Sequence, residues 1–405
     1  MYQIGIYLYL VGVAIASIFC KKVRKMWRGE RQTIALLKEK VNLNDQYIWF
    51  HAASLGEFEQ GRPLIERIRS EHPEYKILLT FFSPSGYEVR KDYNGADIVC
   101  YLPLDTIRNA RRFLRAVRPV MAFFIKYEFW YNYLHILKYR NVPVYSVSSI
   151  FRGDQIFFQW YGRGYAKVLN CFTHFFVQNS ASKQLLSTIG INQVSITGDT
   201  RFDRVLQIKK ASKQLPVVEA FKNGRNVFVA GSSWQPDEDI FIPFFNAHKD
   251  WKLIIAPHVI SEEHLSEITK KLDRKVVRYT QTTPEEAANA DCLIIDCFGL
   301  LSSIYHYGEV AYVGGGFGVG IHNVLEAAVW QVPVIFGPQN QHFQEAQGLL
   351  MSQGGFEIAD NASFTRLMNE LIANPRLLAE SGRQAGEFVC HKAGATDKIL
   401  DYVRL

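Results

Sequence analysis

The stretch EVAYVGGGFGVGIHNVLEAAVWQVPVIFGP, residues 309–338, contains the pattern that decides the fold. An apolar run at 310–313 precedes a loop with five glycines in seven positions, and a helical segment then leads to a second apolar run at 333–336. This order of strand, glycine loop, helix and strand is typical of parallel α/β sheets, which bind ligands at the carboxyl ends of their strands.

The glycine loop is a candidate phosphate site because glycines let backbone N–H groups approach a ligand closely. A helix beginning near His322 and Asn323 would direct its positive end to the same place, and Asn323 is a good N-cap. Glu326 follows within one turn, where a carboxylate can accept hydrogen bonds from ribose hydroxyls. The loop occurs late in the chain, whereas the dehydrogenase fingerprint follows the first strand of a domain. A tight turn built from structural glycines is the alternative.

Apolar runs of strand length form two series, separated by segments of helical length. The first series is 47–50, 77–80, 120–125, 142–147 and 175–177, and the second is 227–230, 253–255, 292–295, 310–313 and 333–336. Runs that are nearly continuous in Val, Ile, Leu and Phe predict parallel sheets covered on both faces. We therefore expect an α/β fold with two Rossmann-like, doubly wound domains facing a cleft.

The domain boundaries follow from the length and from one polar segment. A chain of 405 residues is long for a single core. The segment KKASKQLPVVEAFKNG, residues 209–224, is polar and basic and contains a Pro and a Gly, so we interpret it as a linker. The expected domains are 27–208 and 225–405, with the last helix crossing back to the first domain.

The N-terminus predicts a membrane anchor over residues 1–26. Residues 2–20 are almost wholly apolar, close to the ~20 residues that a helix needs to cross a bilayer. Six cations follow in KKVRKMWRGER, residues 21–31, whereas a secretory signal has its charges before the apolar run. The positive-inside rule then places the rest of the chain on the cytoplasmic side. A buried N-terminal core helix is the alternative.

The remaining composition excludes several classes of protein. The six cysteines form no C-x-x-C pair, which excludes zinc-finger spacing and disfavours a disulfide framework. The formal charge of +7 suits a phosphate-rich partner or an anionic membrane surface. Asp237 and Asp239 spell D-x-D, but they follow Pro236 at an expected helix start, where acids are common. We expect no metal, no cofactor and no nucleic-acid partner.

A second informative segment, FHAASLGEFEQGRPLIERI, spans residues 50–68 and reads as a strand, a turn and a helix. Ser54 and Glu57 lie just past the strand, at the end of the sheet where an α/β domain binds ligands. Glu57 is therefore a candidate general base that activates an acceptor hydroxyl. The alternative is structural, because an acid in the first turn stabilises the helix dipole.

HAASLGE, residues 51–57, resembles the H-x-x-S-x-G-E signature of the 3-deoxy-D-manno-octulosonic acid (Kdo) transferases. The likeness continues along almost the whole chain after residue 26, with similar motifs at 82–87, 101–105, 128–132, 198–203, 231–233 and 342–345. The clearest match runs from Gly315, Gly316 and Phe317 through His322, Asn323 and Glu326 to residues 333–338.

The resemblance implies an inverting GT-B glycosyltransferase that moves Kdo from CMP-Kdo to a lipid A precursor in lipopolysaccharide core biosynthesis. Glu57 would be the catalytic base, and the enzyme would work at the cytoplasmic face of the inner membrane. The implied donor-binding residues are Ser232, Ser233, Pro257, His258, Gly315, Gly316, Phe317, His322, Asn323 and Glu326. The implied acceptor-binding residues are Ser54, Gly56, Glu128 and Arg152. The aromatic and basic segment 151–161 would be a second membrane contact, or else a packed aromatic cluster.

Four positions depart from the family pattern. His258 follows Ala256 and Pro257 directly, so the arginine of A-P-R-H is missing, and Trp234 stands where the family has His. Lys126 replaces the first acid of E-x-E-x-W, and Gln331 replaces a glycine. The cations that could balance the donor are Lys126, Arg152, Arg201 and His258.

Three other functions are compatible with parts of the pattern. A lipid-directed GT-B transferase that uses a UDP-sugar would share the glycine loop but has no reason to carry H-x-x-S-x-G-E. A UDP-sugar epimerase has the same fold and would lack the apolar N-terminus. A non-catalytic membrane protein that binds a nucleotide sugar is the third.

Overall fold

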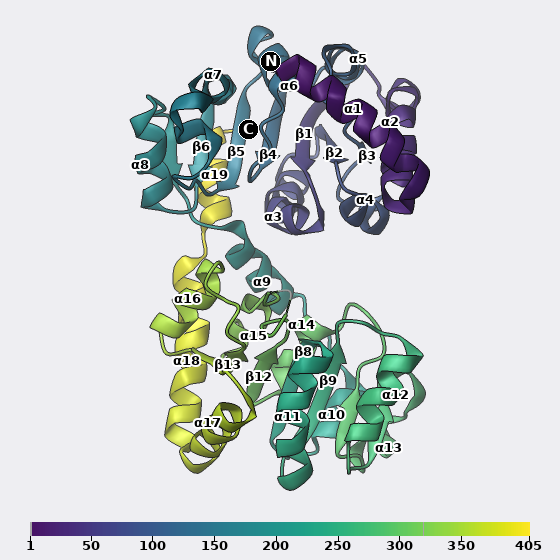
Figure 1. Ribbon diagram of the computed structural model, residues 1–405, viewed down its shortest axis with the longest axis vertical. Helices are drawn as coiled ribbons and strands as arrows, with labels where there is room; N and C mark the ends of the chain where they lie inside the picture. Colours follow the sequence, from purple (N-terminus) through teal and green to yellow (C-terminus); the bar gives the residue numbers. More distant parts are fainter. Residues whose placement is uncertain (1, 319) are drawn as a thin grey trace. The chain divides into compact units, whose positions relative to one another are not determined.

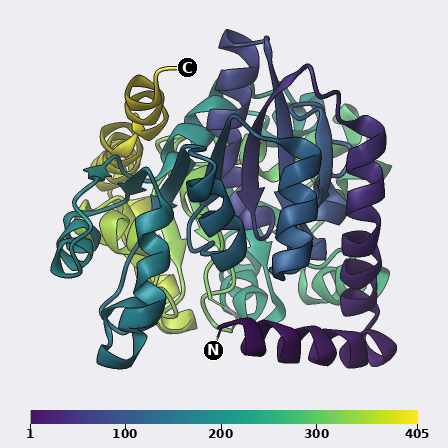
Figure 2. The same ribbon diagram turned by 90° about the horizontal axis from the view of Figure 1, so that it is seen from above.

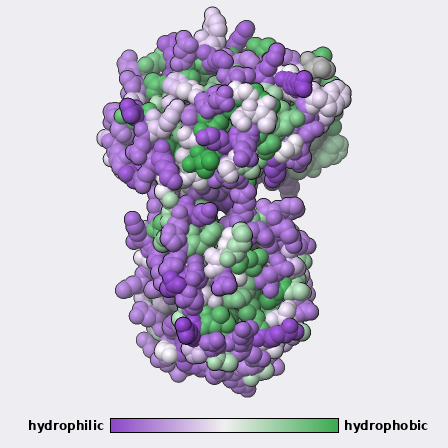
Figure 3. All heavy atoms as spheres, turned by 90° about the vertical axis from the view of Figure 1, so that its left-hand side faces the viewer, coloured by the Kyte–Doolittle hydropathy of each residue, from purple (hydrophilic) through white to green (hydrophobic). Residues whose placement is uncertain are grey.

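The computed structural model describes residues 2–318 and 320–405; Met1 and Val319, within the predicted anchor and glycine loop, lie outside the described residues. The chain forms two compact units (Figure 1). Unit 1 comprises Met1–Arg204 and Ala393–Leu405, and unit 2 comprises Val205–Lys392. On the face shown in Figure 3, hydrophilic side chains dominate the surface of both units and apolar ones form scattered patches.

Unit 1 is built on a seven-stranded parallel sheet in the order β3-β2-β1-β4-β5-β6-β7. Its strands are β1 (Gln46–Ala52), β2 (Tyr75–Phe81), β3 (Ile98–Tyr101), β4 (Met121–Ile125), β5 (Val144–Ser149), β6 (His174–Val177) and β7 (Val194–Ile196). The chain runs outward from β1 to β3 and then returns to β4 beside β1. The order of the strands therefore reverses between β1 and β4, the place where doubly wound sheets bind ligands.

Helices cover both faces of this sheet. The helices of unit 1 are α1 (Tyr2–Phe19), α2 (Lys21–Lys40), α3 (Leu55–Glu71), α4 (Pro84–Arg90), α5 (Ile107–Val117), α6 (Tyr131–Tyr139), α7 (Arg163–Ala166), α8 (Ser180–Thr188) and α19 (Ala395–Val403), of which α1 lies outside the core. Trp49 packs into the core on one face, while Ile48 and Phe50 pack into the core on the other. Both faces are buried, so apolar residues follow one another along the central strands instead of alternating with polar ones.

Unit 2 has a second seven-stranded parallel sheet, in the order β10-β11-β9-β8-β12-β13-β14. Its strands are β8 (Val227–Ser233), β9 (Lys252–Pro257), β10 (Val276–Arg278), β11 (Cys292–Ile294), β12 (Val310–Val313), β13 (Val334–Phe336) and β14 (Gly355–Glu357). Its helices are α10 (Pro216–Lys222), α11 (Gln235–Ala247), α12 (Glu262–Lys271), α13 (Pro284–Ala288), α14 (Leu301–Ile304), α15 (Leu325–Ala328), α16 (Gln344–Met351), α17 (Asn361–Ala373) and α18 (Pro375–Lys392). Here the order reverses between β8 and β12. The doubly wound α/β class predicted from the sequence is confirmed in both units.

The segments around the expected boundaries are helical. α9 (Thr200–Lys210) contains the division between the units, and α10 lies inside the segment 209–224 that reads as a linker. Val218 and Phe221 of α10 are fully buried, which explains the apolar residues within that polar stretch. α2 continues unbroken through Met26, where the sequence suggests an end to the anchor, because Met26, Thr33 and Leu37 are buried.

α1 is an apolar helix that lies along unit 1 (Figure 2). By length and composition it could cross a membrane, and most of its side chains are exposed, with only Val13 buried among the described ones. It is therefore not a core helix. Its start is held to unit 1, because the Tyr2 hydroxyl donates to Asp105 over 2.6 Å and its ring stacks on Tyr131.

Candidate active site

The residues that the sequence assigns to donor binding lie in unit 2, near the carboxyl ends of β8, β9 and β12. The glycine loop follows β12, and its conformation depends on its glycines. A Cβ at Gly314 would lie 2.4 Å from the Ser232 carbonyl oxygen, and one at Gly316 would lie 2.6 Å from the Gly337 Cα. Gly315 has a φ of 95°. These glycines are thus required by the packing of the loop itself, as the structural alternative supposed.

The same packing leaves backbone donors for a ligand. Among the described residues, none accepts a hydrogen bond from the backbone N–H groups of Gly316 and Phe317. Two adjacent N–H groups at the end of a parallel strand can bind a phosphate oxygen. The loop therefore has both an internal structural role and the donors that its sequence predicts.

Asp237 holds the glycine loop in place, a role that its position at a helix start did not reveal. Its buried carboxylate accepts hydrogen bonds from the Tyr312 hydroxyl over 2.7 Å, the Gly315 N–H over 3.0 Å and the Trp234 N–H over 2.8 Å. Burial raises the pKa of Asp237, and these three donors oppose that shift. The bond to Trp234 also caps the N-terminus of α11, so Asp237 has the helix-start role that the sequence indicates as well as its role in the loop.

Replacing Asp237 with alanine should loosen the glycine loop. Gly315, Trp234 and Tyr312 would each lose a buried acceptor, and we expect the free energy of unfolding to fall by about 2–4 kcal/mol. Asp239→Ala is the matched control, because that side chain is 53% exposed and its ion pair is worth little. Denaturant unfolding of both variants measures the difference. Equal free energies of unfolding for the two variants would show that Asp237 does not stabilise the glycine loop.

Three stacked rings stand beside the loop. The Trp234 and His258 rings are 4.6 Å apart, and the His258 and His322 rings are 4.4 Å apart. The Trp234 indole N–H donates to His322 Nε2 over 3.2 Å. Burial, followed by the nearby His258, lowers the pKa of His322 to about 4. His322 is therefore neutral near pH 7, and it can contact a phosphate or carboxylate only through its Nδ1–H.

Asn323 and Glu326 are brought together as the sequence suggests, but the helix that carries them is short. Asn323 Oδ1 accepts the Leu325 N–H over 3.2 Å, and its amide donates to Glu326 over 3.0 Å. α15 covers only Leu325–Ala328, because Gln331 adopts a left-handed φ of 61° and β13 begins soon after it. The expectation of a strong helix dipole at this point is wrong, since few peptide units are aligned.

Ser233 and Pro257 lie at the ends of β8 and β9 and are buried. The Ser233 hydroxyl donates its hydrogen bond to Glu238 over 3.0 Å, so it has no further O–H to donate to a ligand. The His258 N–H donates to the Ser233 carbonyl over 2.9 Å, which fixes the start of the ring stack. Ser233 and Pro257 are therefore part of the buried structure next to the glycine loop, whereas Ser232 is more exposed.

Most of the residues that the sequence assigns to catalysis and acceptor binding lie in unit 1, after the carboxyl ends of β1 and β4. Ser54 is the N-cap residue of α3, and Glu57 lies in the first turn of that helix beside the exposed Gly56. The Ser54 hydroxyl donates a short hydrogen bond to the Glu57 carboxylate. The half-buried carboxylate is thus positioned at the end of the sheet where the order of the strands reverses.

Glu128, which follows β4, contacts the ring nitrogens of two side chains. Its Oε2 lies 3.1 Å from His51 Nε2 and accepts the Trp130 indole N–H over 2.6 Å. His51 is fully buried, and its Nδ1 contacts the Thr80 hydroxyl at 2.9 Å. The first residue of the H-x-x-S-x-G-E motif therefore positions a second carboxylate. Sequence reasoning missed this role, because the two residues are 77 positions apart.

A cavity of about 500 Å³ adjoins Glu128. Its wall is mainly aromatic and includes Phe82, Trp130 and Phe157 together with Tyr2 from α1. In the segment 151–161, Phe157 is buried in the core, whereas Trp160 is 80% exposed. The packed-cluster interpretation therefore holds for the first of these two rings.

The candidate cations in unit 1 differ in their surroundings. Arg201 binds Asp199, with Nη2 2.8 Å from Oδ2. Lys126 and Arg152 each lie 5.9 Å from the centre of the Tyr127 ring, and the Arg152 side chain is 62% exposed. Across the described part of the chain, no group of three or more His, Cys, Asp or Glu side chains is placed to hold a metal ion.

Comparison with known proteins identifies relatives of this chain. A family model described as 3-deoxy-D-manno-octulosonic-acid transferase (kdotransferase) matches residues 27–204. A 3-deoxy-D-manno-octulosonic acid transferase of Aquifex aeolicus is 28% identical over 335 residues, covering 80% of this chain and 86% of that protein. The protein of the same name from Haemophilus influenzae is 25% identical and covers 89% of this chain and 87% of its own length.

Solved structures show the same fold at low sequence identity. The UDP-GlcNAc 2-epimerase of Neisseria meningitidis, bound to UDP-GlcNAc, aligns with a TM-score of 0.63 at 12% identity, covering 88% of this chain and 99% of that one. MurG of Acinetobacter baumannii aligns with a TM-score of 0.56 at 11% identity, covering 89% and 99%. At this identity the likeness concerns the fold alone.

Proposed function

We propose that this chain, whose relatives are 3-deoxy-D-manno-octulosonic acid (Kdo) transferases, is itself a Kdo transferase that moves Kdo from CMP-Kdo to a lipid A precursor, with inversion. The observation that supports this most is the H-x-x-S-x-G-E segment, whose glutamate lies where β1 and β4 end. The proposed reaction is that of the relatives, and the proposed role of each residue rests on its contacts within its own unit.

We propose that unit 2 binds the CMP moiety of the donor. The N–H groups of Gly316 and Phe317 would bind the phosphate, and Glu326, oriented by Asn323, would accept hydrogen bonds from the ribose. The flat stack of Trp234 and His258 offers a surface for a planar base.

We propose that Glu57 in unit 1 is the general base. In a single displacement its carboxylate takes the proton of the acceptor hydroxyl while the hydroxyl oxygen attacks the anomeric carbon of Kdo. The bond from that carbon to the phosphate oxygen breaks, and CMP leaves on the opposite face with the electron pair. Ser54 would orient the carboxylate, while Glu128 and Arg152 would contact the acceptor.

Transfer should not need a divalent metal. The departing phosphate would be stabilised by the N–H groups of the glycine loop, which act as preorganised positive charge. We therefore expect the rate to be unchanged within about twofold after treatment with EDTA. Rates measured with EDTA and after adding back Mg²⁺ decide the point. Complete inactivation that Mg²⁺ reverses would show that a metal stabilises the leaving group.

The lipid acceptor accounts for the apolar N-terminus in this proposal. Moving acyl chains into water costs ~0.8 kcal/mol per CH₂, so the enzyme must reach its acceptor at the membrane. We propose that α1 attaches the chain to the cytoplasmic face of the inner membrane, with the cations of residues 21–31 beside lipid phosphates.

The direct test is a transfer assay with purified full-length protein, CMP-Kdo and a lipid A precursor in detergent micelles. The proposal requires a lipid product heavier by one or more Kdo residues. A UDP-GlcNAc substrate, tested in parallel, examines the epimerase and UDP-sugar alternatives that share this fold. Turnover of the UDP-sugar without turnover of CMP-Kdo would overturn the proposed function.

A further inference from the structure

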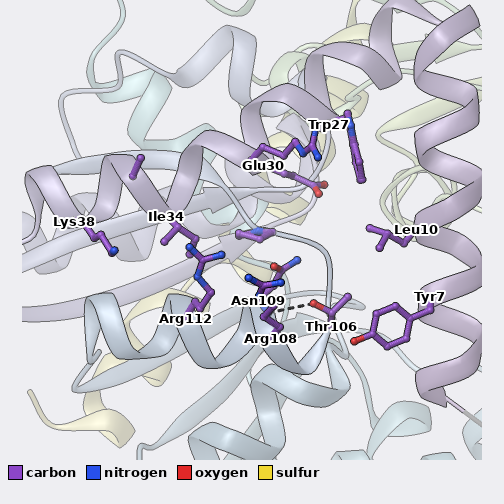
Figure 4. A pocket seen from close by; sticks show the side chains of 13 residues that line it. Tyr7, Leu10, Trp27, Glu30, Ile34, Lys38, Thr106, Arg108, Asn109 and Arg112 are labelled. Carbon is purple, nitrogen blue, oxygen red and sulfur yellow. Dashed lines mark hydrogen bonds between the residues drawn. The ribbon is translucent and has the colours of Figure 1, made fainter.

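A cavity of about 660 Å³ lies between α1, α2 and α5 in unit 1, and Glu57 is not among its lining residues (Figure 4). Tyr7 and Leu10 of α1 form one wall, and Trp27 and Ile34 of α2 extend the apolar lining. The cavity uses none of the residues assigned to transfer, so a separate ligand must be considered.

Four cations surround the cavity and have no acidic partner. Arg31 and Lys38 come from α2, and Arg108 and Arg112 come from α5. Within the described ranges, no carboxylate lies within ion-pair distance of any of these four side chains. Arg108 and Arg112 are one helical turn apart, so they present their charges on the same face of α5.

A buried carboxyl group points into the same space. Glu30 is 6% exposed, and its Oε2 accepts the Leu104 N–H over 3.3 Å. Its Oε1 is buried without a hydrogen-bond partner among the described residues. Burial raises the pKa of Glu30 to about 8, so the group is mainly protonated at neutral pH and can donate an O–H to an anion.

α1, which forms one wall of the cavity, also carries exposed apolar side chains. Ile4, Leu8, Val11 and Ile15 are between 55% and 68% exposed. A ligand in this cavity thus meets positive charge and a hydrogen-bond donor, beside a helix that offers apolar side chains. That combination matches an anionic amphiphile.

We propose that the cavity binds the phosphate headgroup of an anionic membrane phospholipid, whose acyl chains lie along α1. Arg108, Arg112 and Arg31 pair with the phosphate, and Glu30 donates to one of its oxygens. The lipid is a bound component of the membrane and not the acceptor of transfer. The inference rests on the membrane attachment of α1 given under the proposed function, and it is independent of the transfer reaction.

The test measures binding of full-length protein to vesicles by flotation, with phosphatidylglycerol or phosphatidylcholine. Arg108→Ala/Arg112→Ala should weaken binding to phosphatidylglycerol by about 10- to 30-fold, at roughly one order of magnitude or less per cation. The control is Arg111→Ala/Arg115→Ala, which removes the same charge from the same helix outside this cavity. We expect the control to weaken binding by less than about threefold.

Two further measurements make the result specific. Glu30→Gln keeps a donor and should bind as the wild type does, whereas Glu30→Ala should lose affinity, with thermal unfolding confirming that both variants fold. Excess inorganic phosphate should leave the vesicle-bound fraction unchanged. Equal losses for the two arginine pairs would mean that only diffuse surface charge is at work. Displacement by inorganic phosphate would reassign the cavity to a free anion. Either outcome overturns the proposal.

Discussion

Glu57→Gln is expected to lower the rate of Kdo transfer by about 10²–10⁴ while leaving the affinity for CMP unchanged. The amide is nearly the same size as the carboxylate and can still contact Ser54, but it cannot take the acceptor proton. Because Glu57 lies in unit 1 and the nucleotide is proposed to bind in unit 2, the two readouts should separate.

Two further variants sharpen this result. Glu71→Gln changes an acid that is 46% exposed at the other end of α3 and should leave the rate unchanged. Glu128→Gln tests the second carboxylate, which His51 and Trp130 hold in place. If Glu57→Gln retains near wild-type turnover while Glu128→Gln does not, the base is Glu128, and Glu57 is an acid that stabilises the start of α3.

Glu326→Ala is expected to weaken CMP binding by ~1–3 kcal/mol, about 5- to 150-fold, the range for hydrogen bonds that involve a charged group. Asn323 orients this carboxylate through a 3.0 Å bond, so its loss removes a preorganised acceptor for the ribose hydroxyls. Calorimetric titration with CMP measures the change. Glu262→Ala, an 80% exposed acid on α12, is the control. Unchanged affinity in Glu326→Ala would exclude the carboxylate from the ribose site.

The sequence predicts the central strands of both sheets and misses their edges. Each of the ten apolar runs overlaps a strand, and the four strands not predicted, β3, β7, β10 and β14, are the outermost strands of the two sheets. Edge strands are short and partly exposed; β10 has no fully buried residue. They therefore lack the continuous apolar run that a strand buried on both faces requires.

Contacts within the candidate site were predictable where the two interacting residues are close together in the sequence. Ser54 and Glu57, or Asn323 and Glu326, are three positions apart, and turn and helix geometry bring such pairs together. Contacts between strands were not predictable. The pairing of Asp237 with Gly315 depends on β8 lying beside β12, which a single sequence does not specify.

The protonation state of a buried side chain was also not predictable from the sequence. The family pattern implies that His322 binds the donor, but it does not give the charge of the imidazole; burial and the nearby His258 lower the pKa of His322 to about 4. Trp234, a departure from the family pattern, explains part of this state, because its N–H needs an unprotonated acceptor. Only the folded arrangement shows that the imidazole of His322 is neutral near pH 7.

The central claim, that this relative of the Kdo transferases takes its sugar from a CMP ester, is tested most directly by thermal unfolding with CMP and with UDP at equal concentration. A nucleotide that binds the folded state raises its stability, by ~2.7 kcal/mol at a concentration 100 times Kd. The account predicts that CMP raises the Tm in proportion to the logarithm of its concentration while UDP leaves it near that of the free protein. Protection by UDP with none by CMP would contradict it.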